Sequence, residues 1–103
     1  YQVSATRTIA VGVDRLYRAV RDGRVRRRWL EEPIEIRKAT PERSLRITWT
    51  EDGTHVDAHF EERGAGKSRI RVLHRRLPDA GTAESRKAFW KGRLAALKGA
   101  LEP

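Results

Sequence analysis

Hydrophobic and polar residues recur with different periods along the chain, and each change of period marks a new element. Residues 2–11 alternate between apolar and polar positions, which predicts a strand. From residue 13 the apolar side chains recur at helical spacing, and Gly23 ends this first helix. A short second helix is predicted over residues 24–30, because Pro33 then prevents its continuation. The chain therefore opens with a strand followed by two short helices.

Four shorter alternating runs follow, each separated from the next by a polar or glycine-containing turn. They cover residues 34–39, 44–50, 54–62 and 68–74. The turns fall at residues 41–43, 51–53 and 64–66. Since turns this short join antiparallel neighbours, whereas parallel strands need long crossovers, we expect an antiparallel meander.

The last part of the chain suggests how the sheet is covered. The strand SRIRVLH ends at His74, the polar segment RRLPDAGTAESR follows as a loop up to residue 86, and a terminal helix comes after it. The apolar residues of this helix share one face: Trp90, Leu94, Leu97 and Leu101. A long amphipathic helix laid across a curved sheet is able to enclose a cavity, and we expect Trp90 to anchor the helix to the sheet.

Length and composition predict one domain with a modest core over residues 1–103. The chain is 38% hydrophobic and 36% charged, which is too apolar and too periodic for a disordered chain. It contains no cysteine, which excludes disulfides and fits a reducing cytoplasm, and no apolar run approaches the roughly 20 residues of a membrane span. The first residue is Tyr1 rather than methionine, which leaves open a preceding domain in the native protein.

Five short motifs in this order resemble the START-like (SRPBCC, helix-grip) superfamily and, within it, the bacterial heat-shock-protein ATPase activator-like domains. The motifs are SATRTIAVGVDRLYRAVRD, RRRWL with Trp29, ATPERSLRITW ending in Trp49, GKSRIRVLHRRLPD with His74, and AFWKGRLAALKGAL with Trp90. The resemblance covers nearly the whole chain. It implies an α+β helix-grip fold of order β-α-α-β-β-β-β-α, in which an antiparallel sheet wraps around the C-terminal helix.

The chain departs from this family at one point. Members usually carry a further glycine-rich hairpin between the tryptophan of the second helix and the next strands, whereas here Trp29 runs almost directly into Ile34. We therefore expect a shortened form: a single START-like domain with a sheet of about five strands and a smaller or more open cavity.

The concave face of this sheet and the facing helix are predicted to bind a small hydrophobic or aromatic molecule. The candidate ligand-binding residues are Trp29, Trp49, Phe60, Val72, His74, Trp90 and Leu94. In the competing interpretation the same side chains fill the core completely and leave no room for a ligand. Neither interpretation requires a cofactor, and none is predicted.

The sequence favours a binding role over an enzymatic one. It has no nucleophile elbow, P-loop or dinucleotide fingerprint, and His74 is the one titratable group predicted on the concave face. We expect His74 to be a core-edge histidine bonded to the backbone. The wider superfamily includes cyclases, but no catalytic residue is predicted in this chain.

The chain carries a net charge of +9, with 23 basic and 14 acidic residues. Its arginines are densest over residues 15–28, and this run is predicted to bind a partner. The candidate partner-binding residues are Arg24, Arg26, Arg27 and Arg28. The resemblance implies that some members engage a chaperone, and a basic surface suits an acidic protein. Nonspecific nucleic-acid binding is a weaker alternative, because only Trp29 lies close to the basic run. The oligomeric state stays open between monomer and homodimer.

One cluster invites a metal interpretation. The residues His55, Asp57, His59 and Glu61 alternate along one predicted strand and project from its outer face. The two histidines are about 13 Å apart on an extended strand, too far to bind one ion together. The alternative is pairing across strands with Arg46, Arg69 and Arg71, and no metal site is predicted.

Overall fold

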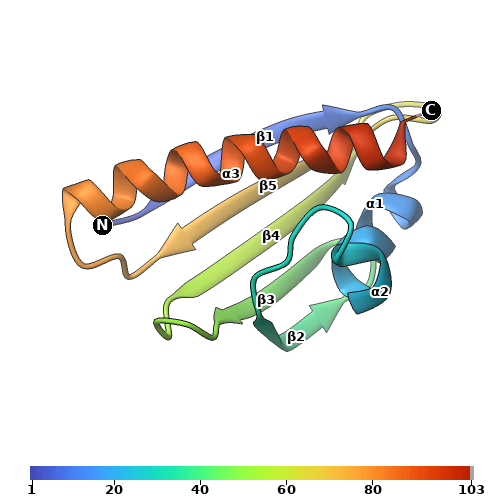
Figure 1. Ribbon diagram of the computed structural model, residues 1–103. Coiled ribbons are helices and arrows are strands. Elements are labelled where there is room, and N and C mark those ends of the chain that lie inside the picture. Colours follow the sequence, from blue (N-terminus) through green and yellow to red (C-terminus); the bar gives the residue numbers. More distant parts are fainter. Residues whose placement is uncertain (103) are drawn as a thin grey trace.

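The computed structural model describes residues 1–102, which form one antiparallel sheet and three helices (Figure 1). The elements are β1 (Val3–Ile9), α1 (Val13–Arg21), α2 (Gly23–Arg26), β2 (Ile34–Thr40), β3 (Ser44–Trp49), β4 (His55–Glu62), β5 (Ser68–Arg75) and α3 (Ala80–Leu101). This order confirms the predicted α+β class and the predicted five strands.

The sheet has the order β1-β5-β4-β3-β2, and every neighbouring pair is antiparallel. The strands β2 to β5 form the predicted meander. The first strand, β1, pairs with β5 at the edge of the sheet opposite β2. Two of the turns need glycine, because Gly53 has φ 72° and Gly64 has φ 126°, values that residues with a Cβ rarely adopt. Because the type and length of a turn fix the register of its hairpin, these turns align the apolar faces of successive strands.

The second helix is shorter than predicted. Residues 24–30 were expected to be helical, but α2 ends at Arg26. The backbone N–H groups of Arg28 and Trp29 bond to carbonyls three residues back, at 3.1 Å each, so the chain tightens into turns. The indole of Trp29 donates to the carbonyl of Ala19 at 2.9 Å, which fastens this tight segment to α1.

The terminal helix begins earlier than predicted. The segment up to residue 86 was expected to be a loop, whereas α3 begins at Ala80. Asp79 is its N-cap, since Oδ1 of Asp79 accepts a hydrogen bond from the backbone N–H of Thr82 at 2.7 Å. The earlier start gives α3 two further turns, which place Arg86 against the β3–β4 turn.

Replacing Asp79 with alanine should lower the free energy of unfolding by about 1 kcal/mol, because the first turn of α3 loses its capping acceptor. Asp79→Asn should retain most of the stability, since asparagine caps nearly as well. Urea denaturation of the three proteins measures both effects. An equal loss in the two variants would contradict a capping role for this side chain.

The core lies between the sheet and the helices, which pack on the same face of the sheet (Figure 1). Its fully buried large side chains are Ile9, Leu16, Leu45, Trp49, Val56, Ile70, Val72, His74, Leu94 and Leu97. The concave face predicted from alternation is thereby confirmed, with Ile34 and Ile36 at its partly buried edge. The alternating strands thus form one side of the core, and the apolar face of α3 forms much of the other.

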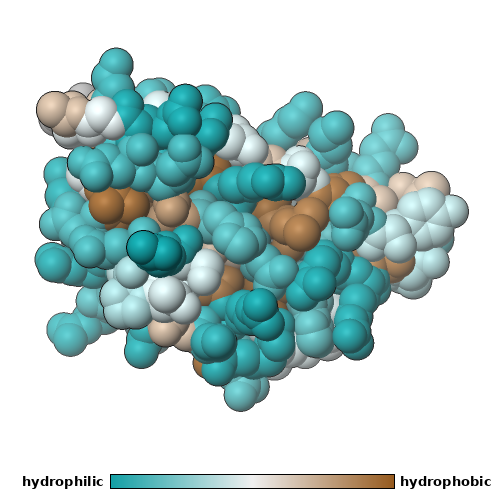
Figure 2. Space-filling model, turned by 180° about the vertical axis from the view of Figure 1, so that it is seen from behind, coloured by the Kyte–Doolittle hydropathy of each residue, from teal (hydrophilic) through white to brown (hydrophobic). Residues whose placement is uncertain are grey.

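The opposite face of the sheet is open to solvent and carries polar residues such as Thr6, His59 and Arg71. Figure 2 shows this side of the molecule, where hydrophilic side chains cover most of the surface and hydrophobic areas are small. No helix within residues 1–102 combines the length and the apolar character needed to cross a bilayer.

Candidate functional site

The interior between the sheet and α3 is filled by the protein's own side chains. The remaining cavity has a volume of about 10 Å³, whereas pockets for small-molecule ligands measure about 300–1,000 Å³. Four of the predicted ligand-binding residues meet around this small void: Trp29, Trp49, Val72 and Trp90. A void of this size holds at most one water molecule, so the three tryptophans act here as core.

The other three predicted ligand-binding residues lie away from this void. Phe60 packs edge-on against Tyr17 of α1, with ring centroids 5.4 Å apart. Leu94 is buried on the sheet-facing side of α3. His74 is fully buried and belongs to a polar network.

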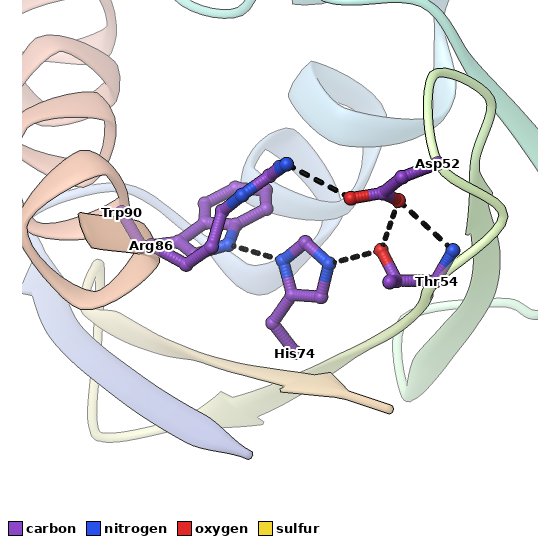
Figure 3. A network of polar contacts seen from close by, with 5 residues as sticks. All are labelled: Asp52, Thr54, His74, Arg86 and Trp90. Atoms are coloured by element: carbon purple, nitrogen blue, oxygen red, sulfur yellow. Dashed lines mark hydrogen bonds and ion pairs between the residues drawn. The ribbon is translucent and has the colours of Figure 1, made fainter. Parts of the chain in front are cut away.

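This network joins β5, the β3–β4 turn and α3 (Figure 3). The indole N–H of Trp90 donates to Nδ1 of His74 at 3.0 Å, so Nδ1 carries no proton. The proton of the neutral imidazole therefore sits on Nε2, which donates to Oγ1 of Thr54 at 2.6 Å. The hydroxyl of Thr54 in turn donates to Oδ1 of Asp52 at 2.6 Å. His74 was expected to bond to the backbone, but its partners are side chains.

The network holds His74 neutral. Burial, followed by the positive charge of Arg86, lowers the pKa of His74 to about 4 against the smaller opposing effect of Asp52. Burial alone would raise the pKa of Asp52, but hydrogen bonds from Thr54 and the charge of Arg86 outweigh it and lower that pKa. With both nitrogens engaged and no charge near neutral pH, His74 serves packing and orientation rather than proton transfer.

Two ion pairs fasten α3 to the loops at the edge of the core. Arg86 contacts Asp52 at 2.9 Å in the β3–β4 turn, and Arg93 contacts Glu32 at 3.4 Å in the segment before β2. Between the two arginines, Phe89 packs edge-on against the indole of Trp49, with centroids 5.6 Å apart. The Arg86 guanidinium also lies 5.1 Å from the centre of the Trp49 ring.

A groove of about 250 Å³ lies at this edge, and we call it the mouth groove. Its lining residues are Glu32, Trp49, Glu51, Ser85, Arg86 and Phe89. Trp49 lines both the mouth groove and the small internal void, so its indole separates the two spaces. The mouth groove is the largest hollow between α3 and the sheet among residues 1–102.

Two residues that line the mouth groove each carry a buried polar atom, inaccessible to solvent, that lacks a hydrogen-bond partner within residues 1–102. These atoms are Nε1 of Trp49 and Oε1 of Glu32. Two other unpartnered atoms belong to Asp57 and Arg75, which already form an ion pair at 3.1 Å with each other. Because buried polar atoms are almost always bonded, this donor and this acceptor each call for a partner, and a molecule in the groove reaches them only when the side chains around them shift.

The sequence reasoning found only Trp49 among the mouth-groove residues. Glu32 lies next to Glu31 before a proline, and nothing in that pair distinguishes the residue whose carboxylate meets α3. Arg86 was assigned to a loop, and Phe89 falls outside the apolar stripe of the predicted helix. The signal that was present is the cap Asp79, because a helix starting there predicts that Arg86, Phe89 and Arg93 share a face.

The predicted partner-binding arginines have different environments. Arg24, Arg27 and Arg28 are exposed, whereas Arg26 turns inward and donates from Nη1 to the carbonyl of Val20 at 2.9 Å. Burial, together with the nearby charges of Arg21 and Arg27, lowers the pKa of Arg26. Arg26 thus holds α2 against α1, and the sequence run is not a single surface.

On the outer face, the acidic side chains of β4 pair with arginines of the neighbouring strand. Glu61 contacts Arg69 at 3.1 Å across the β4–β5 pair, one of the pairs predicted from alternation. Asp57 contacts Arg75 rather than its direct neighbour Arg46. Within residues 1–102, no three histidine or acidic side chains gather in an arrangement that could hold a metal ion.

No protein-family model matches the chain, and no curated protein is significantly similar to it. Solved structures match it over nearly its whole length. The Aha1 dimer from Colwellia psychrerythraea has 15% identity and a TM-score of 0.83, covering 99% of this chain and 96% of that one. The AHSA1 protein from Silicibacter pomeroyi has 18% identity and a TM-score of 0.82, covering 98% and 97%. The fold is that of the AHSA1-like proteins.

This result confirms the START-like (SRPBCC), helix-grip fold implied by the five sequence motifs. A third match, CalU16 from Micromonospora echinospora, has 17% identity and a TM-score of 0.84, covering 98% of this chain and 74% of CalU16. The AHSA1-like fold is present here in the predicted compact form, since the segment after Trp29 enters β2 directly. The Colwellia protein was solved as a dimer.

Proposed function

We propose that this AHSA1-like domain binds a small aromatic molecule in the mouth groove, without catalysing a reaction. The observation that carries the proposal is that two residues lining one groove, Trp49 and Glu32, each carry a buried polar atom without a partner, Nε1 and Oε1 respectively. The sequence suggested a ligand between sheet and helix. The proposal moves that ligand from the filled interior to the edge of the core.

The two atoms define the polar groups of the ligand. The indole N–H of Trp49 donates only, so the ligand needs an acceptor there. The ionised carboxylate of Glu32 accepts only, so the ligand also needs a donor such as a hydroxyl, an amine or a ring N–H. A phenol, an indole or a hydroxyquinoline carries such groups on a flat ring.

The remaining walls define its size and charge. A volume of about 250 Å³ suits a molecule of one or two rings. The half-buried ring of Phe89 favours stacking or edge contacts with such a ring. Among the charged lining residues, Arg86 pairs with Asp52 and Glu32 pairs with Arg93, which leaves Glu51 without an ion pair within residues 1–102. Neutral or weakly basic compounds are therefore favoured over acids.

Screening neutral and weakly basic phenols, anilines, indoles and hydroxyquinolines by thermal shift and tryptophan fluorescence tests the proposal. At least one compound should bind with a dissociation constant in the micromolar to low millimolar range. Trp49→Phe keeps the ring but removes the donor, and it should weaken binding about tenfold, because one hydrogen bond is lost. Glu32→Gln should weaken binding by a similar factor.

The matched control is Trp29→Phe, since the N–H of Trp29 already bonds to Ala19 and its ring lies outside the mouth groove. This variant should be less stable yet bind the same compounds with unchanged affinity. The proposal is wrong if no compound binds at millimolar concentration, or if Trp49→Phe and Glu32→Gln bind as tightly as the natural sequence.

A further inference from the structure

A second groove lies where α1, the segment after α2 and the last turn of α3 meet. It has a volume of about 200 Å³. Its lining residues are Arg15, Arg18, Ala19, Val25, Arg28, Ala100 and Leu101. We call it the arginine groove. Three guanidinium groups therefore surround a floor of small and aliphatic side chains, and no acidic residue is among the lining.

The three arginines are not used by the fold. Within residues 1–102, none of Arg15, Arg18 and Arg28 forms an ion pair, although other arginines of the chain do. Asp14 lies four residues before Arg18 on α1 and still makes no ion pair with it. Like charges one turn apart disfavour an isolated helix by a few tenths of a kcal/mol. Within residues 1–102 these three charges have no acidic side chain as a partner, so they are available to an acidic group from another molecule.

We propose that the arginine groove docks an acidic peptide segment of a protein partner, with an apolar side chain of that segment on the groove floor. The charges supply the complementarity, since three unpaired guanidinium groups can each bind a carboxylate. The floor supplies the apolar contact, because the half-buried Val25 and the exposed Ala100 line it. At about 200 Å³ the groove has room for one or two side chains presented by a peptide.

A protein partner fits the groove better than a nucleic acid does. Single-stranded nucleic acids stack their bases on aromatic side chains, and none lines this groove. The aliphatic side chains of the groove floor cannot form hydrogen bonds or ion pairs with the phosphate groups of a nucleic acid.

This surface differs from the run of arginines that stands out in the sequence. Of the four predicted partner-binding residues, only Arg28 lines the arginine groove. The fold brings Arg28 together with Arg15 and Arg18 of α1, and with the end of α3 about eighty residues further along the chain. Adjacency in space, rather than in sequence, defines the docking surface.

Fluorescence anisotropy with synthetic peptides tests the proposal. The probe is a labelled peptide with two central leucines flanked on each side by three acidic residues, and its partner probe has glycines in place of the leucines. The leucine peptide should bind at least about fivefold more tightly than the glycine peptide, because one buried leucine contributes about 1 kcal/mol or more. The variant R15E/R28E should weaken binding of the leucine peptide by at least about tenfold.

The matched control is R43E/R71E, which changes the net charge equally but places it away from the groove, on exposed arginines of the sheet side. It should alter peptide binding less than about threefold. Arg15→Glu puts a negative charge in the first turn of α1, where it is favourable, and circular dichroism melts confirm folding of each variant. Arg28→Ala serves as a milder second variant with a smaller loss in the same direction.

Three results would overturn the proposal. One is an equal loss of binding in R15E/R28E and in R43E/R71E, which would reduce the interaction to net charge. Another is equal binding of the leucine and glycine peptides, which would remove the role of the apolar floor. The third is tighter binding of a DNA oligonucleotide than of the leucine peptide at physiological salt, which would identify a nucleic-acid surface instead.

Discussion

Replacing Trp90 with alanine is expected to lower the free energy of unfolding by about 3–5 kcal/mol, the usual cost of truncating a buried aromatic side chain. Trp90 is 3% exposed and packs edge-on against both Trp49 and Phe89, with centroids 5.6 and 5.4 Å away. Its N–H also bonds to Nδ1 of His74. Urea or thermal denaturation measures the loss, which is a large fraction of the roughly 5–15 kcal/mol that stabilises a typical domain.

The conservative variant Trp90→Phe separates packing from hydrogen bonding. It keeps most of the ring but leaves Nδ1 of His74 buried without a donor, which costs about 1–3 kcal/mol. The expected order of stability is therefore the natural sequence, then Trp90→Phe, then Trp90→Ala. A loss below 1 kcal/mol for the alanine variant would show that α3 is not anchored through Trp90.

The free energy of unfolding should fall by roughly 3 kcal/mol as the pH is lowered from about 6.5 to 4, because of His74 alone. The pKa of His74 is lowered to about 4 in the folded protein, against 6.5 for an ordinary histidine. Between these values the unfolded chain binds a proton that the folded protein does not. The contribution of His74 is thus complete above pH 6.5 and lost as the pH approaches 4.

Urea denaturation at a series of pH values measures this loss, with His74→Gln as the control. Glutamine does not titrate, so this variant should be less stable at neutral pH and should show a flatter profile between pH 6.5 and 4. The acidic groups with lowered pKa values, such as Asp52 and Glu61, lose their contribution mainly below about pH 5 in both proteins, so the difference between the two profiles reports His74. An imidazole of His74 that titrates near 6.5 by NMR would contradict the buried network.

Most of the fold could be predicted from the sequence because the strands are regular. One face of each strand is buried, so alternation alone assigns residues such as Ile47, Val56 and Val72 to the core. The ends of the helices were harder to predict, since each depends on one or two hydrogen bonds. The cap at Asp79 and the tight turns after Arg26 moved two boundaries that the apolar pattern had placed elsewhere.

Less of the candidate site could be predicted, because its contacts join distant segments. The Glu32–Arg93 pair spans 61 positions and the Asp52–Arg86 pair spans 34. No pattern of neighbouring residues predicts either pair. The sequence therefore identified Trp49 as a candidate site residue but did not identify Glu32. The amount of free space was also beyond the sequence, since whether three tryptophans line a cavity or fill it depends on how their rings interlock.

The three tryptophans offer the most direct test of the account, because their indole N–H groups have different partners. Trp29 bonds to the carbonyl of Ala19 and Trp90 to His74, while the N–H of Trp49 has no partner within residues 1–102. A ¹H–¹⁵N correlation spectrum resolves one indole signal from each. Adding hydroxyindole or hydroxyquinoline at millimolar concentration should shift the Trp49 signal strongly and the other two little. Movement of the Trp29 and Trp90 signals with Trp49 unchanged, or no movement of any signal, would contradict a binding site in the mouth groove.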